Sequence, residues 1–301
     1  MNYSAMKEDW DNLIGKPLVK VALWLLVLCS GINAAFGSAN KETKGVVLCY
    51  ERERQALLKF KHALNASSDT LTSWVGDNCC LWEGVGCNSE TGHVVKLNLR
   101  NTINMDSGEI DPSLLELRHL SYLDLSNNFF GFSIPKFFGS FLKLRYLNLS
   151  YAAFSGTVPL QIGNISGLRY LDLHHNSLQV ENLQWLSHLS SLQYLDLGDA
   201  NLSMVADWVQ PINMIPSLTV LRISSCGLRD SSTPLHLNLT SLTVLDIDYN
   251  SLTSKPLDWL ANLHSLVTLD LRHNRFFDRL NERLDGFYVK MVATVMKKIQ
   301  G

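Results

Sequence analysis

The chain has 301 residues, with 26 basic and 28 acidic side chains and a formal net charge of −2. This near balance, without a basic stripe, gives no sign of a nucleic-acid partner. The sequence also contains no G-x-S-x-G, H-E-x-x-H, phosphate-binding glycine loop or kinase signature. An enzyme is therefore not expected, and neither is a cofactor or a metal centre.

The first 39 residues have the features of a secretory leader. Lys16 and Lys20 precede the apolar run 21–29, and small residues at 35–39 offer cleavage sites. The alternative is a membrane anchor, but nine apolar residues are too few for a bilayer, which needs about 20. Residues 1–39 are therefore predicted to be a cleaved signal peptide, which leaves no membrane span in the mature chain.

The segment 46–92 is predicted to be a cap for the repetitive segment that begins at residue 93. Within residues 50–66, Leu57, Phe60 and Leu64 recur at helical spacing. Disulfides are the default for cysteines in an oxidising compartment, and adjacent cysteines rarely bond to each other without strain. This leaves two of the three pairings among the four cysteines near this helix: Cys49, Cys79, Cys80 and Cys87. A further cysteine, Cys226, is interpreted as a small buried residue.

The phrase L-x-x-L-x-L recurs through residues 93–280. Its aligned leucines, separated by 26, 24, 24, 24, 26, 24 and 24 residues, are Leu97, Leu123, Leu147, Leu171, Leu195, Leu221, Leu245 and Leu269. A leucine-rich phrase at this period is the signature of a leucine-rich-repeat solenoid. Apolar and polar residues alternate in each phrase, which predicts a short strand, and stacking joins these strands into a parallel sheet on a concave face. The predicted fold is an α/β solenoid of about eight repeats.

An asparagine follows the aligned leucine by five residues in half of these repeats: Asn128, Asn176, Asn250 and Asn274. An amide at this position can satisfy backbone groups that the turn would otherwise bury without a partner. We predict this structural role for the asparagines rather than contact with a ligand.

Two kinds of motif resemble a known family. CYERERQALLKFK (49–61) and SWVGDNCCLWEGVGC (73–87) resemble the N-terminal cap of plant extracellular leucine-rich-repeat proteins. LSYLDLSNNFFGFSIP (120–135) and LRYLNLSYAAFSGTVP (144–159) resemble the plant-type repeat L-x-x-L-x-x-L-x-L-S-x-N-x-L-x-G-x-I-P. The resemblance implies the pairing Cys49–Cys79 and Cys80–Cys87. It also implies a short second sheet after the strands, formed where the turn ends in Ile-Pro or Val-Pro.

More narrowly, residues 181–203 and 214–228 look like the receptor-like proteins grouped with the fungal-xylanase receptors. Members of that group have a repeat ectodomain, one membrane span and a short tail without a kinase. Residues 281–301 depart from the family pattern and read as an amphipathic helix. This segment is either a substitute cap for the last repeat or a tail foreign to the fold of a truncated chain, and we favour truncation.

Outward positions of the predicted strands form a grid on the concave face. The residue before the aligned leucine is tyrosine in four successive repeats. Four tyrosines on strands about 4.8 Å apart span roughly 15 Å, and tyrosine gives large contact area at low entropic cost. The simpler alternative is that tyrosine merely suits strand surfaces. The candidate ligand-binding residues are Tyr122, Asp124, Tyr146, Tyr170, Asp172, His174, Tyr194, Asp196, Arg222, Asp246, Asp270 and Arg272.

The acidic row of this grid favours a ligand with a basic surface. The adjacent His174 and His175 are interpreted as part of an exposed polar face rather than as a metal or acid–base site. Sequons add to the evidence for a secretory route. Predicted glycosylation sites are Asn65, Asn148, Asn164, Asn201 and Asn238.

Recognition is the predicted task. The resemblance implies a cell-surface receptor-like protein that senses a peptide or protein elicitor in plant defence and signals through a partner receptor kinase. The alternatives are a soluble secreted inhibitor of a pathogen wall-degrading enzyme and an inactive truncated fragment. The expected location is the plasma membrane if a span follows downstream, and otherwise the extracellular space.

Overall fold

The computed structural model describes residues 48–64, 71–103, 108–232, 234, 236–253, 259–260 and 262–275. All of them belong to one compact unit of the chain, Val47–Gly301. The predicted signal peptide (1–39), the predicted tail (281–301) and the sequon at Asn65 lie outside the described residues. No helix within the described ranges combines the length and the apolar character needed to cross a membrane.

The aligned leucines lie within the eight parallel strands of one main sheet. Its strand order is β1-β2-β3-β4-β6-β8-β9-β10-β11. All neighbours pair in parallel except β1 and β2, and leucine faces leucine in register, as Leu123 faces Leu147. The strands are β1 (Val85–Cys87), β2 (Val94–Asn98), β3 (Tyr122–Asp124), β4 (Tyr146–Asn148), β6 (Tyr170–Asp172), β8 (Tyr194–Asp196), β9 (Val220–Arg222), β10 (Val244–Asp246) and β11 (Thr268–Asp270). The predicted leucine-rich-repeat solenoid is confirmed.

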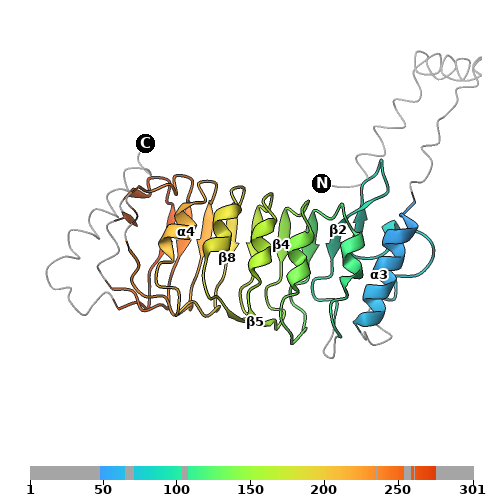
Figure 1. Ribbon diagram of the computed structural model, residues 1–301, viewed down its shortest axis with the longest axis horizontal. Coiled ribbons are helices and arrows are strands. Elements are labelled where there is room, and N and C mark those ends of the chain that lie inside the picture. Colours follow the sequence, from blue (N-terminus) through green and yellow to red (C-terminus); the bar gives the residue numbers. More distant parts are fainter. Residues whose placement is uncertain are drawn as a thin grey trace, which may run out of the picture. The chain divides into compact units, whose positions relative to one another are not determined.

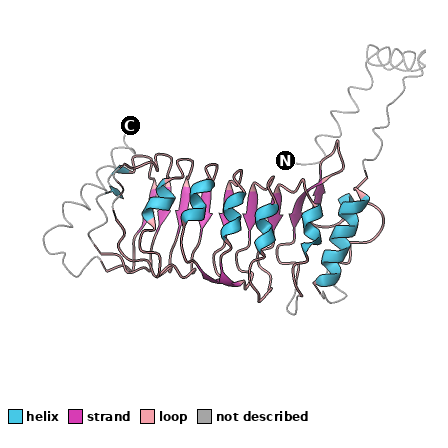
Figure 2. Cartoon of the chain, in the orientation of Figure 1, coloured by secondary structure: helices cyan, strands magenta, loops and turns pink. Residues whose placement is uncertain are grey.

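Short helical turns lie side by side over one face of the main sheet (Figures 1 and 2). They are η2 (Pro112–Glu116), η3 (Lys136–Ser140), η4 (Leu160–Asn164), η5 (Gln184–His188) and α4 (Val209–Asn213). A second parallel sheet joins β5 (Ser155–Thr157) to β7 (Ser177–Gln179). The resemblance implies this sheet only where a coil ends in Ile-Pro or Val-Pro, whereas β7 belongs to a coil that lacks that ending.

Leucine side chains fill the space between the sheet and the helical turns. Leu144, Leu147 and Leu149 of one coil are completely buried. Each such side chain contributes about 1.5–3 kcal/mol when it leaves water, and every inner coil buries its leucines against two neighbours. The helical turns also pack closely, because a Cβ atom at Gly163 would lie 2.7 Å from the carbonyl oxygen of Trp185 in the next coil.

The buried asparagines satisfy the backbone of the turns, as the sequence predicts. The Nδ2 atom of Asn128 donates to the carbonyl oxygens of Leu99 and Leu125, both at 2.8 Å. Its Oδ1 atom accepts from the backbone N–H groups of Thr102 at 3.1 Å and Ile103 at 2.8 Å. Since these partners lie in two coils, each asparagine also ties one coil to the one before it.

All eight strand-to-turn junctions hold a non-glycine residue in the left-handed region. These residues, with φ between 48° and 66°, are Asn101, Asn127, Tyr151, His175, Asp199, Ser225, Tyr249 and His273. The conformation costs roughly 1–2 kcal/mol for each L-residue. It also aims the backbone N–H at the next coil, as from Tyr151 to the carbonyl oxygen of His174 at 3.0 Å. The hydrogen bonds between coils therefore offset a strain that recurs in every repeat.

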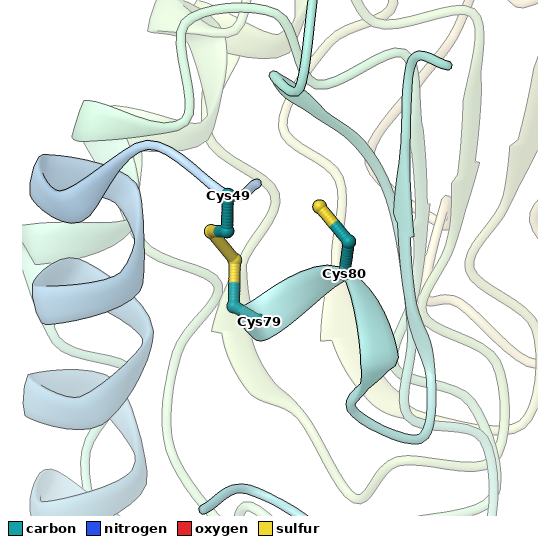
Figure 3. Close-up of side chains that lie close together, drawn as sticks. All are labelled: Cys49, Cys79 and Cys80. Carbon is teal, nitrogen blue, oxygen red and sulfur yellow. A yellow bond between two sulfur atoms is a disulfide. The ribbon is translucent and has the colours of Figure 1, made fainter. Parts of the chain in front are cut away.

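The cap consists of helix α3 (Glu51–Ala63), the turn η1 (Cys79–Leu81) and strand β1. Cys49 is bonded to Cys79 and Cys80 to Cys87, the pairing that the resemblance implies, with Cα atoms 5.4 and 5.5 Å apart. Figure 3 shows the bond between Cys49 and Cys79, with the neighbouring Cys80 taking no part in it. Two stacked indoles, 5.3 Å apart between ring centres, fill the space beside α3: Trp74 and Trp82.

Cys226 is buried, as predicted. Its thiol lies 3.2 Å from the carbonyl oxygens of Leu197 and Ser224. Burial raises the pKa of this thiol, with a smaller contribution from Asp199 and Asp196. The group therefore stays a neutral donor within the core.

Candidate functional site

The four predicted tyrosines form a continuous column of parallel rings on the main sheet. Ring centres are 4.2 Å apart between Tyr122 and Tyr146, 4.3 Å between Tyr146 and Tyr170, and 4.2 Å between Tyr170 and Tyr194. Neighbouring rings are tilted by 12° or less. The in-register pairing of the strands produces this column, because it places each tyrosine directly beside the next.

A cation lies at each end of the column. The Nζ atom of Lys96 is 4.9 Å from the ring centre of Tyr122. At the other end, the guanidinium carbon of Arg222 is 5.9 Å from the ring centre of Tyr194, and Nη1 donates to the tyrosine hydroxyl at 3.3 Å. A cation over the face of an aromatic ring is attracted by the negative charge of the ring's π electrons. Lys96 is absent from the predicted set although it occupies the same position before an aligned leucine, so the repeat alignment itself could have identified it.

Each tyrosine hydroxyl is oriented by the polar residue two positions later. The hydroxyls of Tyr122, Tyr170 and Tyr194 donate to Asp124, Asp172 and Asp196 at 3.2, 3.1 and 3.3 Å. Burial, followed by the nearby carboxylates, raises the pKa of Tyr194 to about 12. Burial also raises the pKa of Tyr122 and of Tyr170. These hydroxyls therefore remain protonated donors.

The polar row beside the tyrosines is buried over its first four members. Asp124, Asn148, Asp172 and Asp196 are only 3–8% exposed. Each accepts a hydrogen bond from the backbone N–H two residues later, as Asp124 does from Ser126 at 3.0 Å. The row faces outward, but the expectation that it is exposed is wrong for this stretch, because the tyrosine hydroxyls and the turns lie over it. These side chains orient the surface, and any contact with a ligand stays a prediction.

His174 lies between two of these buried carboxylates. Its Nδ1 atom is 2.5 Å from Asp172 Oδ1 and 3.9 Å from Asp196 Oδ2. The hydrogen bond to Asp172 raises the pKa of His174, and burial opposes this effect. The residue is half-buried and firmly paired, which the interpretation as an exposed polar face did not anticipate. The neighbouring His175, in contrast, is exposed and lies 2.6 Å from Asp199.

A shallow hollow of about 450 Å³ opens beside His174. It is bordered by Ser126, Asn127 and the exposed ring of Tyr151, which contacts His174 edge-on with ring centres 4.8 Å apart. Tyr151 belongs to no predicted set. Its place in a left-handed turn gives no local signal of a surface role, since the repeat pattern leaves that position free.

The last two repeats present a different, more polar surface. Asp246 and Asp270 are partly exposed there, with Asp248 close to both. The Nη2 atom of Arg272 lies 2.6 Å from Oδ2 of Asp270, and this arginine lowers the pKa of the Asp270 carboxyl. Burial and the charge of Asp246 raise the pKa of Asp248. The structure thus separates the twelve predicted residues into an aromatic column with a buried polar floor and a more exposed charged end.

The sequons differ in exposure. Asn164, Asn201 and Asn238 are exposed. Asn148 is buried, its Nδ2 atom donates to the Tyr146 hydroxyl at 3.3 Å, and its Oδ1 atom accepts from the Ser150 hydroxyl at 2.7 Å. Because a glycan would attach at this Nδ2 atom, the structure argues against modification of Asn148 in the folded chain.

Three known protein families match parts of the chain. The family described as leucine-rich-repeat N-terminal domain matches residues 51–88, and two leucine-rich-repeat families match residues 119–141 and residues 159–202 and 216–276. Among curated proteins, the chain is similar to receptor-like protein EIX1 of Solanum lycopersicum, with 40% identity over 65% of this chain and 20% of that protein. Receptor-like protein EIX2 of the same species is 41% identical over 40% of this chain and 12% of that protein.

Among solved structures, the chain is similar to the leucine-rich-repeat ectodomain of the plant membrane receptor kinase GASSHO1/SCHENGEN3 from Arabidopsis thaliana, in complex with CASPARIAN STRIP INTEGRITY FACTOR 2. The TM-score is 0.60 with 25% identity, over 74% of this chain and 30% of that chain. This chain therefore spans at most a fifth of the two curated relatives and under a third of the solved ectodomain.

Proposed function

Because the chain is a leucine-rich-repeat protein homologous to plant receptor-like proteins, we propose that its main sheet recognises a peptide or protein elicitor in plant defence. The site would begin at Lys96, follow the tyrosine column to Arg222 and include the hollow beside His174. Recognition would be non-enzymatic. Signalling would then depend on a partner receptor kinase, since the resemblance implies a receptor without a kinase of its own.

The observation that carries this proposal is the rigidity of the tyrosine column. Each inner ring is fixed between two others, and the hydroxyls are tied to the polar row beneath them. A surface ordered before binding loses little side-chain entropy when a ligand arrives. Aromatic rings and arginine are also the residue types that most often dominate the energy of protein interfaces.

The proposed location is the secretory pathway and the cell surface. The two disulfides of the cap suit an oxidising compartment, and three exposed sequons are available for glycans. Homology to receptor-like proteins supports the same location.

A binding measurement tests the proposal. The full chain, expressed in plant cells, would be immobilised and probed with a fungal endoxylanase, the ligand class that the resemblance suggests. We expect saturable binding that Tyr170→Ala and Arg222→Glu each weaken at least about tenfold, since interface anchors contribute 1–2 kcal/mol or more. Arg229→Glu, which changes an exposed arginine away from the sheet, is the matched control and should leave the affinity unchanged.

Three outcomes would change the conclusion. Equal binding by all three variants would show that the main sheet is not the recognition surface. Loss of xylanase activity on adding the chain would instead favour the alternative, a secreted inhibitor of a wall-degrading enzyme. Complete absence of binding would exclude endoxylanase as the elicitor.

A further inference from the structure

Three potential metal ligands meet where the cap joins the first repeat. Glu53 comes from α3, His93 from the segment before β2, and His119 from the segment between η2 and β3. One carboxylate oxygen and one ring nitrogen from each histidine all lie within 4.8 Å of one another. These residues are more than 25 positions apart in sequence, so only the folded cap brings them together.

Glu53 is a buried carboxylate with little compensation for its charge. It is 4% exposed and lies in the first turn of α3. Its Oε2 atom accepts from the backbone N–H of Val94 at 2.8 Å, and its Oε1 atom lies 3.0 Å from His93 Nδ1. Within the described ranges, its ion-pair partner is that histidine and not a lysine or arginine. A buried carboxylate of this kind is costly unless a cation or further donors accompany it.

The two imidazoles are held in place beside this carboxylate. His93 stacks on Tyr50 with ring centres 4.0 Å apart and an angle of 3°. His119 meets His93 edge-on at 3.9 Å. Its nitrogens make no side-chain hydrogen bond with the described part of the chain.

We propose that Glu53, His93 and His119 bind a divalent transition-metal ion, with Zn²⁺ as the best fit. Zn²⁺ prefers nitrogen and oxygen ligands at about 2.0–2.2 Å in a tetrahedron, which places ligand atoms roughly 3.3 Å apart. His93 Nδ1 and Glu53 Oε1 are already 3.0 Å apart. The ion replaces the proton between them, His119 completes a three-residue set by a small side-chain rotation, and water takes the fourth position.

The neighbouring bonds support such a site. The Val94 N–H fixes one oxygen of Glu53 and leaves the other free for the ion. Hydrogen bonds of this kind to a ligating carboxylate orient it and contribute substantially to metal affinity. Because the three ligands belong to the cap and the first repeat, the bound ion would clip α3 to the solenoid.

Other groups of potential ligands within the described ranges are less suitable. Cys49 and Cys79 form a disulfide, so neither offers a thiolate to a metal ion. Around His174, both carboxylates already accept hydrogen bonds from tyrosines. The group of Asp246, Asp248 and Asp270 is a partly exposed acidic cluster without a histidine.

Cobalt titration tests the proposal directly, because Co²⁺ reports a low-symmetry site through its visible absorption. The full chain, without an affinity tag and with its disulfides oxidised, would be titrated with Co²⁺ and then with Zn²⁺. We expect one equivalent of Co²⁺ to bind and Zn²⁺ to displace it. His119→Gln should weaken binding at least about tenfold to a hundredfold, which is the loss seen even for residues that only support a ligand.

His188→Gln is the matched control, since it removes an exposed histidine of η5. It should bind Co²⁺ like the wild-type chain. Zn²⁺ should raise the thermal midpoint of the wild type and of this control but not that of His119→Gln. His119→Gln is the informative variant because its ring nitrogens make no side-chain hydrogen bond in the described chain, so the metal-free protein should keep its midpoint. Absence of the cobalt signal in the wild type, or an equal signal in His119→Gln, would overturn the proposal.

Discussion

The side-chain amide of Asn176 donates a hydrogen bond to the carbonyl oxygen of Leu149, one coil earlier, at 2.8 Å. The same amide donates to Leu173 and accepts from the backbone N–H groups of Ala152 and Phe154. A single buried side chain therefore connects the turns of two successive coils.

Asn176→Ala should accordingly be strongly destabilising. The substitution leaves at least two buried backbone groups without partners, and each such loss costs about 1–3 kcal/mol. We expect the free energy of unfolding to fall by roughly 3 kcal/mol in urea titrations followed by circular dichroism. Asn262→Ala, at an exposed asparagine, should change it by less than about 0.5 kcal/mol. Similar losses in both variants would contradict the role assigned to Asn176.

The two disulfides should contribute unequally to stability. Cys49 and Cys79 are 30 residues apart, whereas Cys80 and Cys87 are 7 apart. A disulfide stabilises the folded chain because it constrains the unfolded one, and this effect grows with loop length. The expected stabilisation is roughly 3.5 kcal/mol for the longer loop and roughly 2.5 kcal/mol for the shorter one. The double serine variants of each pair, compared by chemical unfolding, should follow this order. The reverse order would indicate that local packing outweighs loop length.

His174 should make the stability of the chain depend on pH. Asp172 raises the pKa of His174 in the folded chain, while in the unfolded chain the value is about 6.5. The stabilisation is then fully present below about pH 6.5 and is lost as pH rises through the folded-state pKa. The difference in urea midpoint between the wild type and His174→Gln should therefore be larger at pH 5 than at pH 8.5. Asp196 and Asp199 face the same ring and are unchanged in this comparison.

Glycan mapping should separate buried from exposed sequons. Enzymatic release of glycans in water labelled with heavy oxygen, followed by peptide mass spectrometry, should mark Asn164, Asn201 and Asn238 but not Asn148. The reason is that a sugar on Asn148 would remove its contacts with Tyr146 and Ser150. A high occupancy at Asn148 in folded, secreted protein would contradict the packing of β4.

Much of this fold could be predicted because the same pattern of leucines recurs in each repeat. The aligned leucines located all eight parallel strands, and the asparagines after them satisfied the turns as expected. Alternation within a strand predicts which side a residue faces, but it does not predict what covers that side. Asp124 and Asp172 face outward and are nevertheless buried, because a tyrosine hydroxyl and a turn lie over each of them.

Contacts between segments far apart in the sequence also could not be predicted. The pairing of Glu53 with His93 joins residues 40 positions apart, and no periodicity connects them. The strand β7 arises for a similar reason, since it pairs with β5 of the preceding coil although its own sequence lacks the usual ending. In both cases the neighbour in space, rather than the local sequence, determines the structure.

The shared register of the tyrosine strands makes whole coils interchangeable. Tyr146 pairs with Tyr170, and Tyr170 pairs with Tyr194, at the same position of each strand. Removing residues 170–193 would consequently place β8 beside β4, where β6 now lies. The register of the strands would be unchanged, and the tyrosine column would have one ring fewer. Within these strands, a deletion or insertion of 24 residues should keep the register, whereas a gain or loss of one residue within a strand should break the alignment of the strands stacked upon it.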